Sequence, residues 1–448
     1  MLIMSCGIYP RKQLICLLII KQLQFITNEF KHSLKMIKGL MFKINKPVKK
    51  IFLLFFILFT LVISLAFDKR KLIDKIKVEK YRVNESSFFI IYNNNLILQS
   101  AGFVVKKGAK EENREIYGIN HVWEHLFFRN KINGKSIKDI LNDCQYNATT
   151  HNDYISFYAV GDYEKILRTF IYALNYPNFN NEDLELEKKI VITELSMRNF
   201  EINPFKIYTN PTGGTIQTVN NISFQKMLSF MKNVEKKNVS YFVILNNQDK
   251  IDLNKFFDNV EIDYSLSISL EPKLWDQDSK NIYDDFLSFV STFDLYLNKN
   301  NNNLLLYNSY TNFTNREIFY LDLISFYFSN DFFEKNRKKL LSYGINNMES
   351  YIYPQREELT ITILLSLERK EYSDKEKKLT KREQEIKDLL LSELKNIDYD
   401  SFYRSYMGLY NDLLRNFSDS WNFTQIIPFF VYSEKWNLLN YYVRGCEN

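Results

Sequence analysis

Apolar and polar residues follow two different rhythms along this chain. Runs rich in β-branched and aromatic residues predict strands, first within residues 88–108, where "FFIIY" and "LILQSAGFVVKKG" flank an asparagine turn, and again at 154–160 and 239–247. Apolar residues that recur every three to four positions predict helices at 163–175 and 182–200. Because strands and helices mix without strict alternation, the pattern predicts an α+β fold.

The second half of the chain repeats this layout. A polar stretch at 266–285 predicts a linker, residues 294–310 read as strand, asparagine turn and strand, and 375–397 predict a long amphipathic helix. We therefore expect two related α/β-sandwich-type domains, at 80–270 and 280–448, that form a clam. Each is expected to hold a mixed, mainly antiparallel sheet packed with helices.

An uncharged run near the N-terminus stands apart from this pattern. Residues 51–67 are 17 consecutive residues without a charge, and lysines precede them. Within 36–75 this arrangement is typical of a membrane-inserting segment and fits both a cleaved signal peptide and a membrane anchor. The rest of the chain is then expected outside the cytoplasm, secreted or membrane-anchored, with the periplasm included. Residues 1–35 are a doubtful or over-extended N-terminus, because a start at Met36 or Met41 gives a tidier signal.

Composition narrows the functional classes. The net charge of +6 is small, and much of the excess comes from the first 75 residues, so nucleic acid is not expected as a partner. The 4 cysteines show no C-x-x-C spacing, which argues against a disulfide framework and against a cysteine zinc site. Any metal must therefore be held by histidine and carboxylate side chains.

The chemistry centres on residues 118–130, "GINHVWEHLFFRN". The chain holds only 4 histidines, yet His121 and His125 stand one helical turn apart with Glu124 between them. Two neutral imidazoles so placed can bind one zinc ion, and the carboxylate can deprotonate a water beside it. The alternative is an exposed helix with surface histidines. Catalytic zinc needs a third protein ligand, which must come from elsewhere.

The helix predicted at 182–200 supplies candidates for that ligand. Glu187 and Glu194 are two turns apart on a partly apolar face. Burying such carboxylates is costly unless a metal or hydrogen bonds compensate. Glu194 can complete the metal site, and Glu187 can support it from outside the ligand set.

These residues resemble the pitrilysin/insulinase family of zinc metallopeptidases, the inverzincins with H-x-x-E-H that include the mitochondrial processing peptidases. The resemblance extends through "NNNLILQSAGFVVKKGAKEENREIYG" before the motif, "NATTHNDYISFY" after it, and "TGGTIQTVNNISFQKMLSFMKN" further on. It covers residues 86–265, and the chain corresponds to a single unit of the processing-peptidase type. The remainder matches only in general layout.

The resemblance implies a role for each residue of the site. The zinc ligands would be His121, His125 and Glu194. Glu124 would be the general base and Glu187 would orient the site, both as catalytic residues. Asn147 and Ala148 would bind substrate by presenting a strand edge to an extended peptide.

One departure concerns the second half. Active relatives carry a tyrosine that holds the substrate carbonyl, and Asn347 occupies that position here. Arg337, Tyr351 and Tyr353 are the candidates to replace it. The sequence thus predicts a zinc-dependent endopeptidase for extended or unfolded peptides.

Two other functions stay open. One is a non-catalytic or weakly active peptide-binding or scaffold subunit of a peptidase complex, and the other is a membrane receptor domain with incidental histidines. The expected partners are a peptide or unfolded protein substrate, the membrane through the N-terminal segment, and a second copy or a related subunit in a homodimer or heterodimer.

Overall fold

The computed structural model describes the chain from Lys75 onward, with gaps; the described ranges are 75–198, 213–246, 249–269, 277–300, 303–354, 358–367 and 381–444. They belong to one compact unit, Lys75–Asn448. The uncharged run at 51–67 lies outside these ranges. Within them, no helix combines the length and the apolar character needed to cross a bilayer.

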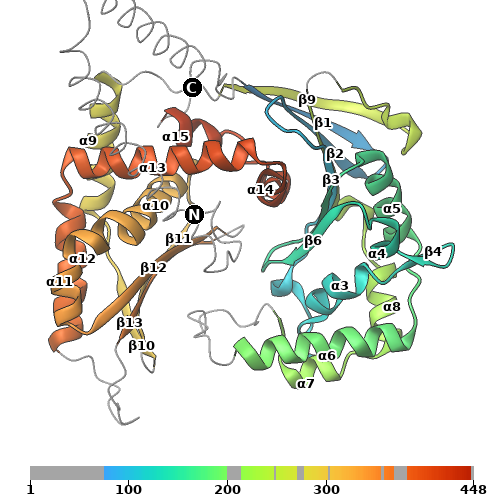
Figure 1. Ribbon diagram of the computed structural model, residues 1–448, viewed down its shortest axis with the longest axis horizontal. Helices are drawn as coiled ribbons and strands as arrows, with labels where there is room; N and C mark the ends of the chain where they lie inside the picture. Colours follow the sequence, from blue (N-terminus) through green and yellow to red (C-terminus); the bar gives the residue numbers. More distant parts are fainter. Residues whose placement is uncertain are drawn as a thin grey trace, which may run out of the picture. The chain divides into compact units, whose positions relative to one another are not determined.

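A seven-stranded sheet forms the framework of the first half (Figure 1). Its strands are β1 (Lys75–Val83), β2 (Ser86–Asn93), β3 (Ser100–Val105), β6 (Gln145–Thr150), β7 (Ile155–Val160), β8 (Val239–Leu245) and β9 (Val260–Ser269). They lie in the order β6-β7-β3-β8-β2-β1-β9. Only β2 and β8 run parallel, so the sheet is mixed and mainly antiparallel, as predicted.

The helices of the first half are α3 (Ile119–Phe127), α4 (Ile137–Ile140), α5 (Tyr163–Asn175), α6 (Asn181–Arg198), α7 (Ile216–Asn220) and α8 (Phe224–Lys232), with a small hairpin of β4 (Lys131–Ile132) and β5 (Lys135–Ser136). Helices α3 and α5 pack against the sheet through an aromatic core, and α6 and α8 pack on α3. The rings of Phe127 and Phe157 lie 4.4 Å apart, and those of Phe127 and Phe170 lie 5.5 Å apart. These contacts tie α3 to β7 and α5, and so fix α3 on the sheet.

The second half holds a four-stranded antiparallel sheet in the order β10-β11-β13-β12. Its strands are β10 (Tyr296–Asn300), β11 (Asn303–Thr311), β12 (Ile345–Pro354) and β13 (Glu358–Leu367). The helices are α9 (Gln277–Ser291), α10 (Asn315–Tyr327), α11 (Phe333–Ser342), α12 (Lys381–Lys395), α13 (Tyr399–Ser418), α14 (Ser420–Ser433) and α15 (Leu438–Arg444). The architecture is therefore α+β, with two sheets that each carry helices.

One predicted strand is shorter than expected. The strand expected from Leu96 begins only at Ser100, because the residues before it form a turn in which Ile97 is 93% exposed. Helix α4 begins at a capping box formed by Ser136 and Asp139 and ends at Ile140. It stops there because the chain turns into β6.

Helix α14 crosses from the second half to pack on the seven-stranded sheet, which the sequence pattern did not predict. The Thr424 hydroxyl donates to Ser100 Oγ at 2.8 Å, and the Asn93 amide donates to the Phe417 carbonyl at 2.9 Å. The rings of Tyr158 and Trp421 are 5.7 Å apart. The two halves of the chain therefore share a buried, hydrogen-bonded contact.

Candidate metal centre

Helix α3 presents two faces with different chemistry. Val122, Trp123 and Leu126 are almost fully buried in the core and hold the helix in place. His121 and His125 lie on the other side, towards α6, against which α3 packs (Figure 1), and Glu124 beside them contacts β6. The apolar positions of the helix therefore set the direction in which its polar side chains point.

Helix α6 brings Glu194 to both histidines. His121 Nε2 lies 3.3 Å from one carboxylate oxygen of Glu194, and His125 Nε2 lies 3.6 Å from the other. One nitrogen or oxygen of each residue falls within 4.8 Å of the others, and this is the only such group of three found among the described residues. The three residues that the sequence singled out as ligands are thus adjacent.

The donor set fits zinc. His121 Nε2 and His125 Nε2 lie 3.3 and 3.6 Å from different oxygens of Glu194, and one donor atom of each residue lies within 4.8 Å of the others, which makes the three residues candidates to hold one zinc ion. Both imidazoles offer Nε2, and Glu194 offers a carboxylate, which is the His₂Glu set of known catalytic zinc sites. No fourth protein donor joins the group within the described ranges, so a position is left for water or substrate.

Glu187 lies on the far side of His125 from Glu194. It is only 2% exposed, and one of its oxygens lies 3.4 Å from His125 Nδ1. The other oxygen accepts a 2.6 Å hydrogen bond from Arg129 Nε. Burial alone would raise the pKa of Glu187, but the bonds from His125 and Arg129 outweigh it and lower that pKa.

Glu124 lies beside the ligand group and is held by a residue that sequence reasoning missed. The Thr150 hydroxyl, at the end of β6, donates to Glu124 Oε2 at 2.6 Å. Burial raises the pKa of Glu124, opposed by the neighbouring His121 and by this hydrogen bond. The alternation of "NATT" places Ala148 and Thr150 on the same face of β6, which is the signal that identifies Thr150.

The residues expected to meet substrate lie on an edge strand. Asn147 and Ala148 belong to β6, whose only neighbour among the described strands is β7. The Ala148 side chain is 4% exposed and packs into the core, whereas the Asn147 amide reaches the Tyr158 hydroxyl at 3.4 Å. What β6 offers outward is therefore its backbone edge.

Asn347 and the residues proposed to replace the missing tyrosine lie on β12 and α11, far along the sequence from the candidate metal ligands. Asn347 is exposed on β12 and donates to Glu349 at 3.0 Å, and the Tyr351 hydroxyl bonds the same carboxylate. Arg337 is exposed on α11 and lies 3.9 Å from Glu334. The Tyr353 side chain falls outside the described part of the chain.

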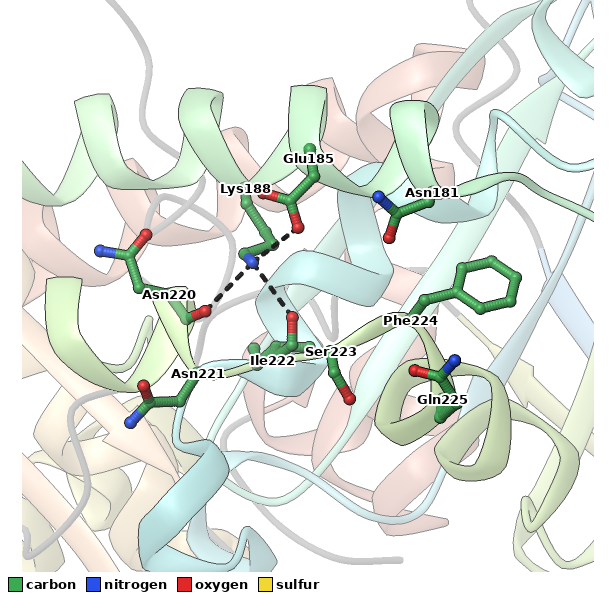
Figure 2. A pocket seen from close by; sticks show the side chains of 9 residues that line it. All are labelled: Asn181, Glu185, Lys188, Asn220, Asn221, Ile222, Ser223, Phe224 and Gln225. Atoms are coloured by element: carbon green, nitrogen blue, oxygen red, sulfur yellow. Dashed lines mark hydrogen bonds and ion pairs between the residues drawn. The ribbon is translucent and has the colours of Figure 1, made fainter.

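A pocket of about 440 Å³ lies on the opposite flank of α6 (Figure 2). Lys188 reaches into it and is nearly buried. Its ammonium donates to Glu185 at 2.8 Å and to the carbonyls of Asn220 and Ile222, both at 3.1 Å. Because these three acceptors use its three protons, Lys188 braces α6 against the α7–α8 connection, and it offers nothing further to a ligand.

The N-terminus of α3 is capped by Glu112, a second residue that the sequence did not reveal. Gly118 at the N-cap has a left-handed φ of 92° and no capping side chain, and an added Cβ would lie 2.5 Å from the Gly213 carbonyl oxygen. Glu112 supplies the acceptors instead, at 2.7 Å from the Gly118 N–H and 2.8 Å from the Asn120 N–H. A carboxylate at this end also complements the helix dipole.

Glu112 is expected to make stability depend on pH. Burial raises its pKa from 4.5 to about 7, so its contribution to stability is fully present below pH 4.5 and is lost as pH rises through about 7. The shift corresponds to roughly 3 kcal/mol. Denaturant midpoints of the metal-free protein should therefore fall from pH 5 to pH 8 more steeply in the wild type than in Glu112→Gln. Glu111→Gln, at an exposed neighbour, should match the wild type, and a Glu112→Gln profile parallel to the wild type would contradict this.

Comparison with known proteins bears on the same region. Residues 91–206 match the family described as Insulinase (Peptidase family M16). The chain is 28% identical over 134 residues to a Bacillus subtilis (strain 168) protein described as "Uncharacterized zinc protease YmxG". That match covers 27% of this chain and 31% of the relative, so the chain spans less than a third of the curated relative that it matches.

Two solved structures share most of the fold. A protease from Helicobacter pylori has a TM-score of 0.60 at 13% identity, over 83% of this chain and 92% of that chain. A peptidase M16 inactive domain from Pseudomonas fluorescens has a TM-score of 0.53 at 12% identity, over 81% and 89%. At these identities the likeness shows the fold. Residues 91–206, which carry the His and Glu cluster, match the pitrilysin/insulinase family of peptidases, and the fold of the chain agrees with that match.

Proposed function

We propose that the chain is a zinc-dependent endopeptidase of the H-x-x-E-H type that cleaves extended or unfolded peptides. One observation carries the proposal. His121, His125 and Glu194 place two imidazole nitrogens and a carboxylate oxygen within 4.8 Å of one another. Glu124 stands beside them on α3. The family match and the zinc protease described in Bacillus subtilis support the same chemistry.

His121, His125 and Glu194 would hold the metal. When bound, zinc supplies a Lewis acid that polarises the scissile carbonyl and makes water in the site more acidic. Glu124 takes the proton of the attacking water on its carboxylate and delivers it to the amide nitrogen as the carbon–nitrogen bond breaks. Thr150 fixes Oε2 of Glu124, and no donor among the described residues occupies Oε1, which is left to carry the proton.

The substrate is proposed to bind along β6. The outer edge of this strand leaves backbone N–H and C=O groups of Asn147 and its neighbours available to an extended peptide. Such pairing selects for chain conformation more than for side chains. It therefore suits unfolded or flexible peptides. The clam of two related domains stays a prediction that goes with this binding mode.

A non-catalytic peptide-binding subunit is the second candidate. Asn347, where the resemblance calls for a tyrosine, is exposed and bonded to Glu349, so it offers an amide in place of a phenol. The fold itself does not separate the two functions, because it is shared with a solved domain described as inactive. Loss of a carbonyl-binding group raises the activation free energy by several kcal/mol, so cleavage becomes slower but does not stop. Glu124 has no purpose in a purely binding subunit, which favours the peptidase.

The proposal includes a dimeric partner and a location outside the cytoplasm. A second copy or a related subunit would supply the missing hydroxyl in a dimer. The segment within 36–75 would export the chain, as a cleaved signal or as an anchor, and place the site outside the cytoplasm. N-terminal sequencing of the mature protein distinguishes cleaved signal from anchor.

Cleavage assays separate the two candidates. The full-length chain is incubated with quenched-fluorescence peptides of mixed sequence, untreated, after chelation, and after zinc is restored. A peptidase cleaves within the peptides, stops on chelation and recovers with zinc. A binding subunit retains zinc and peptide but cleaves in none of the three conditions. A well-folded chain that takes up no zinc contradicts both.

A further inference from the structure

Arg129 occupies a position just beyond α3 that the proposed mechanism does not use. Its Nε donates to Glu187 at 2.6 Å, across to α6. The Arg129 side chain is 29% exposed, whereas Glu187 is 2% exposed. A charge-assisted bond to a buried carboxylate has a defined direction, because the planar guanidinium offers its donors in fixed orientations.

The two oxygens of Glu187 serve different partners. Oε1 accepts from Arg129 Nε, and Oε2 lies 3.4 Å from His125 Nδ1. With one oxygen held by Arg129, the carboxylate plane is fixed and the second oxygen is directed at the imidazole. Glu187 then accepts the Nδ1 proton of His125, which leaves Nε2 as the nitrogen that faces Glu194.

Of the two histidines, only His125 depends on Glu187 for its orientation. The other imidazole, His121, has its Nδ1 buried without a hydrogen-bond partner in the described part of the chain. Its ring is set by packing, since it is 4% exposed. The ring orientation and tautomer of His125 depend instead on Glu187, and the orientation of Glu187 depends on Arg129.

Lys138 provides a comparison within the same site. Its ammonium lies 3.8 Å from the Glu187 oxygen that Arg129 contacts, and its side chain is 38% exposed. At this distance it adds positive charge near the carboxylate but makes no hydrogen bond. Arg129 and Lys138 therefore separate the effect of a directed bond from the effect of nearby charge.

We propose that Arg129 is a positioning residue of the metal centre, which orients the zinc ligand His125 through Glu187. The proposal rests on the proposed zinc site and adds a chain of three residues, Arg129 to Glu187 to His125, that links the end of α3 to α6. Arg129 itself touches neither metal nor substrate.

The test measures zinc affinity by competition with a chelator and the melting temperature of the metal-free chain, for wild type, Arg129→Ala, Arg129→Lys and Lys138→Ala. Loss of an outer partner of a metal ligand weakens binding about 10- to 100-fold, and we expect this for Arg129→Ala. Arg129→Lys should recover part of the loss and stay about threefold to tenfold weaker than wild type, because an ammonium keeps the charge without the fixed fork. Lys138→Ala should change affinity less than about threefold.

The outcomes distinguish this inference from the proposed function. If the wild type takes up no zinc, the zinc site fails and the inference fails with it. If the wild type binds zinc and Arg129→Ala binds it equally well, only the inference is overturned. A lower melting temperature with unchanged affinity would make Arg129 a structural brace and also overturns it. Should Arg129→Ala not fold, wild-type affinity in Arg129→Lys is the overturning result.

Discussion

Replacing Glu124 with glutamine is expected to lower peptide cleavage by about 10²- to 10⁴-fold while zinc stays bound. Glutamine has the same shape and can still accept the hydrogen bond from Thr150, but it cannot take a proton from water. Glu124 is not one of the three grouped donors, so the metal should remain. The measurement is kcat/KM on a quenched peptide together with the zinc content of the same sample.

A matched control sharpens this experiment. Glu115 is an exposed glutamate on the segment before α3, and Glu115→Gln should leave both cleavage and zinc content unchanged. Undiminished cleavage by Glu124→Gln would show that another group is the base. Loss of zinc together with cleavage would mean that Glu124 serves the metal instead.

Glu194→Gln is expected to have the other large effect, on metal binding. It replaces the anionic donor of the group by a neutral amide, so zinc affinity should fall by more than the roughly 100-fold upper range for losing an outer partner. Competition with a chelator measures the affinity, and cleavage at limiting zinc should fall in parallel. Glu182→Gln, at the exposed start of the same helix, is the control. A Glu194→Gln chain that holds zinc as the wild type does would remove Glu194 from the ligand set.

Much of the fold could be predicted from local pattern. The helix expected at 163–175 appears as α5, because an amphipathic period shows within a single segment, and the helix expected at 182–200 appears as α6. The strand expected from Leu96 was partly wrong, because apolar residues such as Ile97 can also lie exposed in a turn, and composition does not separate the two cases.

The candidate site divides in the same way. His121, Glu124 and His125 are neighbours on one helical turn, so spacing alone placed them together. The sequence did not predict the contacts of Thr150, Arg129 and Glu112. The Thr150 and Glu112 bonds depend on how β6 and the segment before α3 meet that helix, and the Arg129 bond depends on how α6 packs against it.

Contacts between residues far apart in the sequence were the hardest to predict. The packing of α14 on the seven-stranded sheet joins Thr424 to Ser100, which stand 324 positions apart. An apolar helix shows in the sequence that it will be buried, but it does not show which surface it will cover. For the same reason the sequence of α6 did not predict that Lys188 would hydrogen-bond the Asn220 carbonyl and hold α6 against the α7–α8 connection.

The zinc content of the purified full-length chain is the most direct test of the metal centre. Elemental analysis after extensive dialysis against metal-free buffer, followed by addition of zinc and a second dialysis, gives the number of ions retained per chain. We expect one tightly held zinc ion per chain, lost in Glu194→Gln and retained in Glu124→Gln. A folded wild-type chain that retains no zinc would contradict the metal centre, and with it the proposed peptidase.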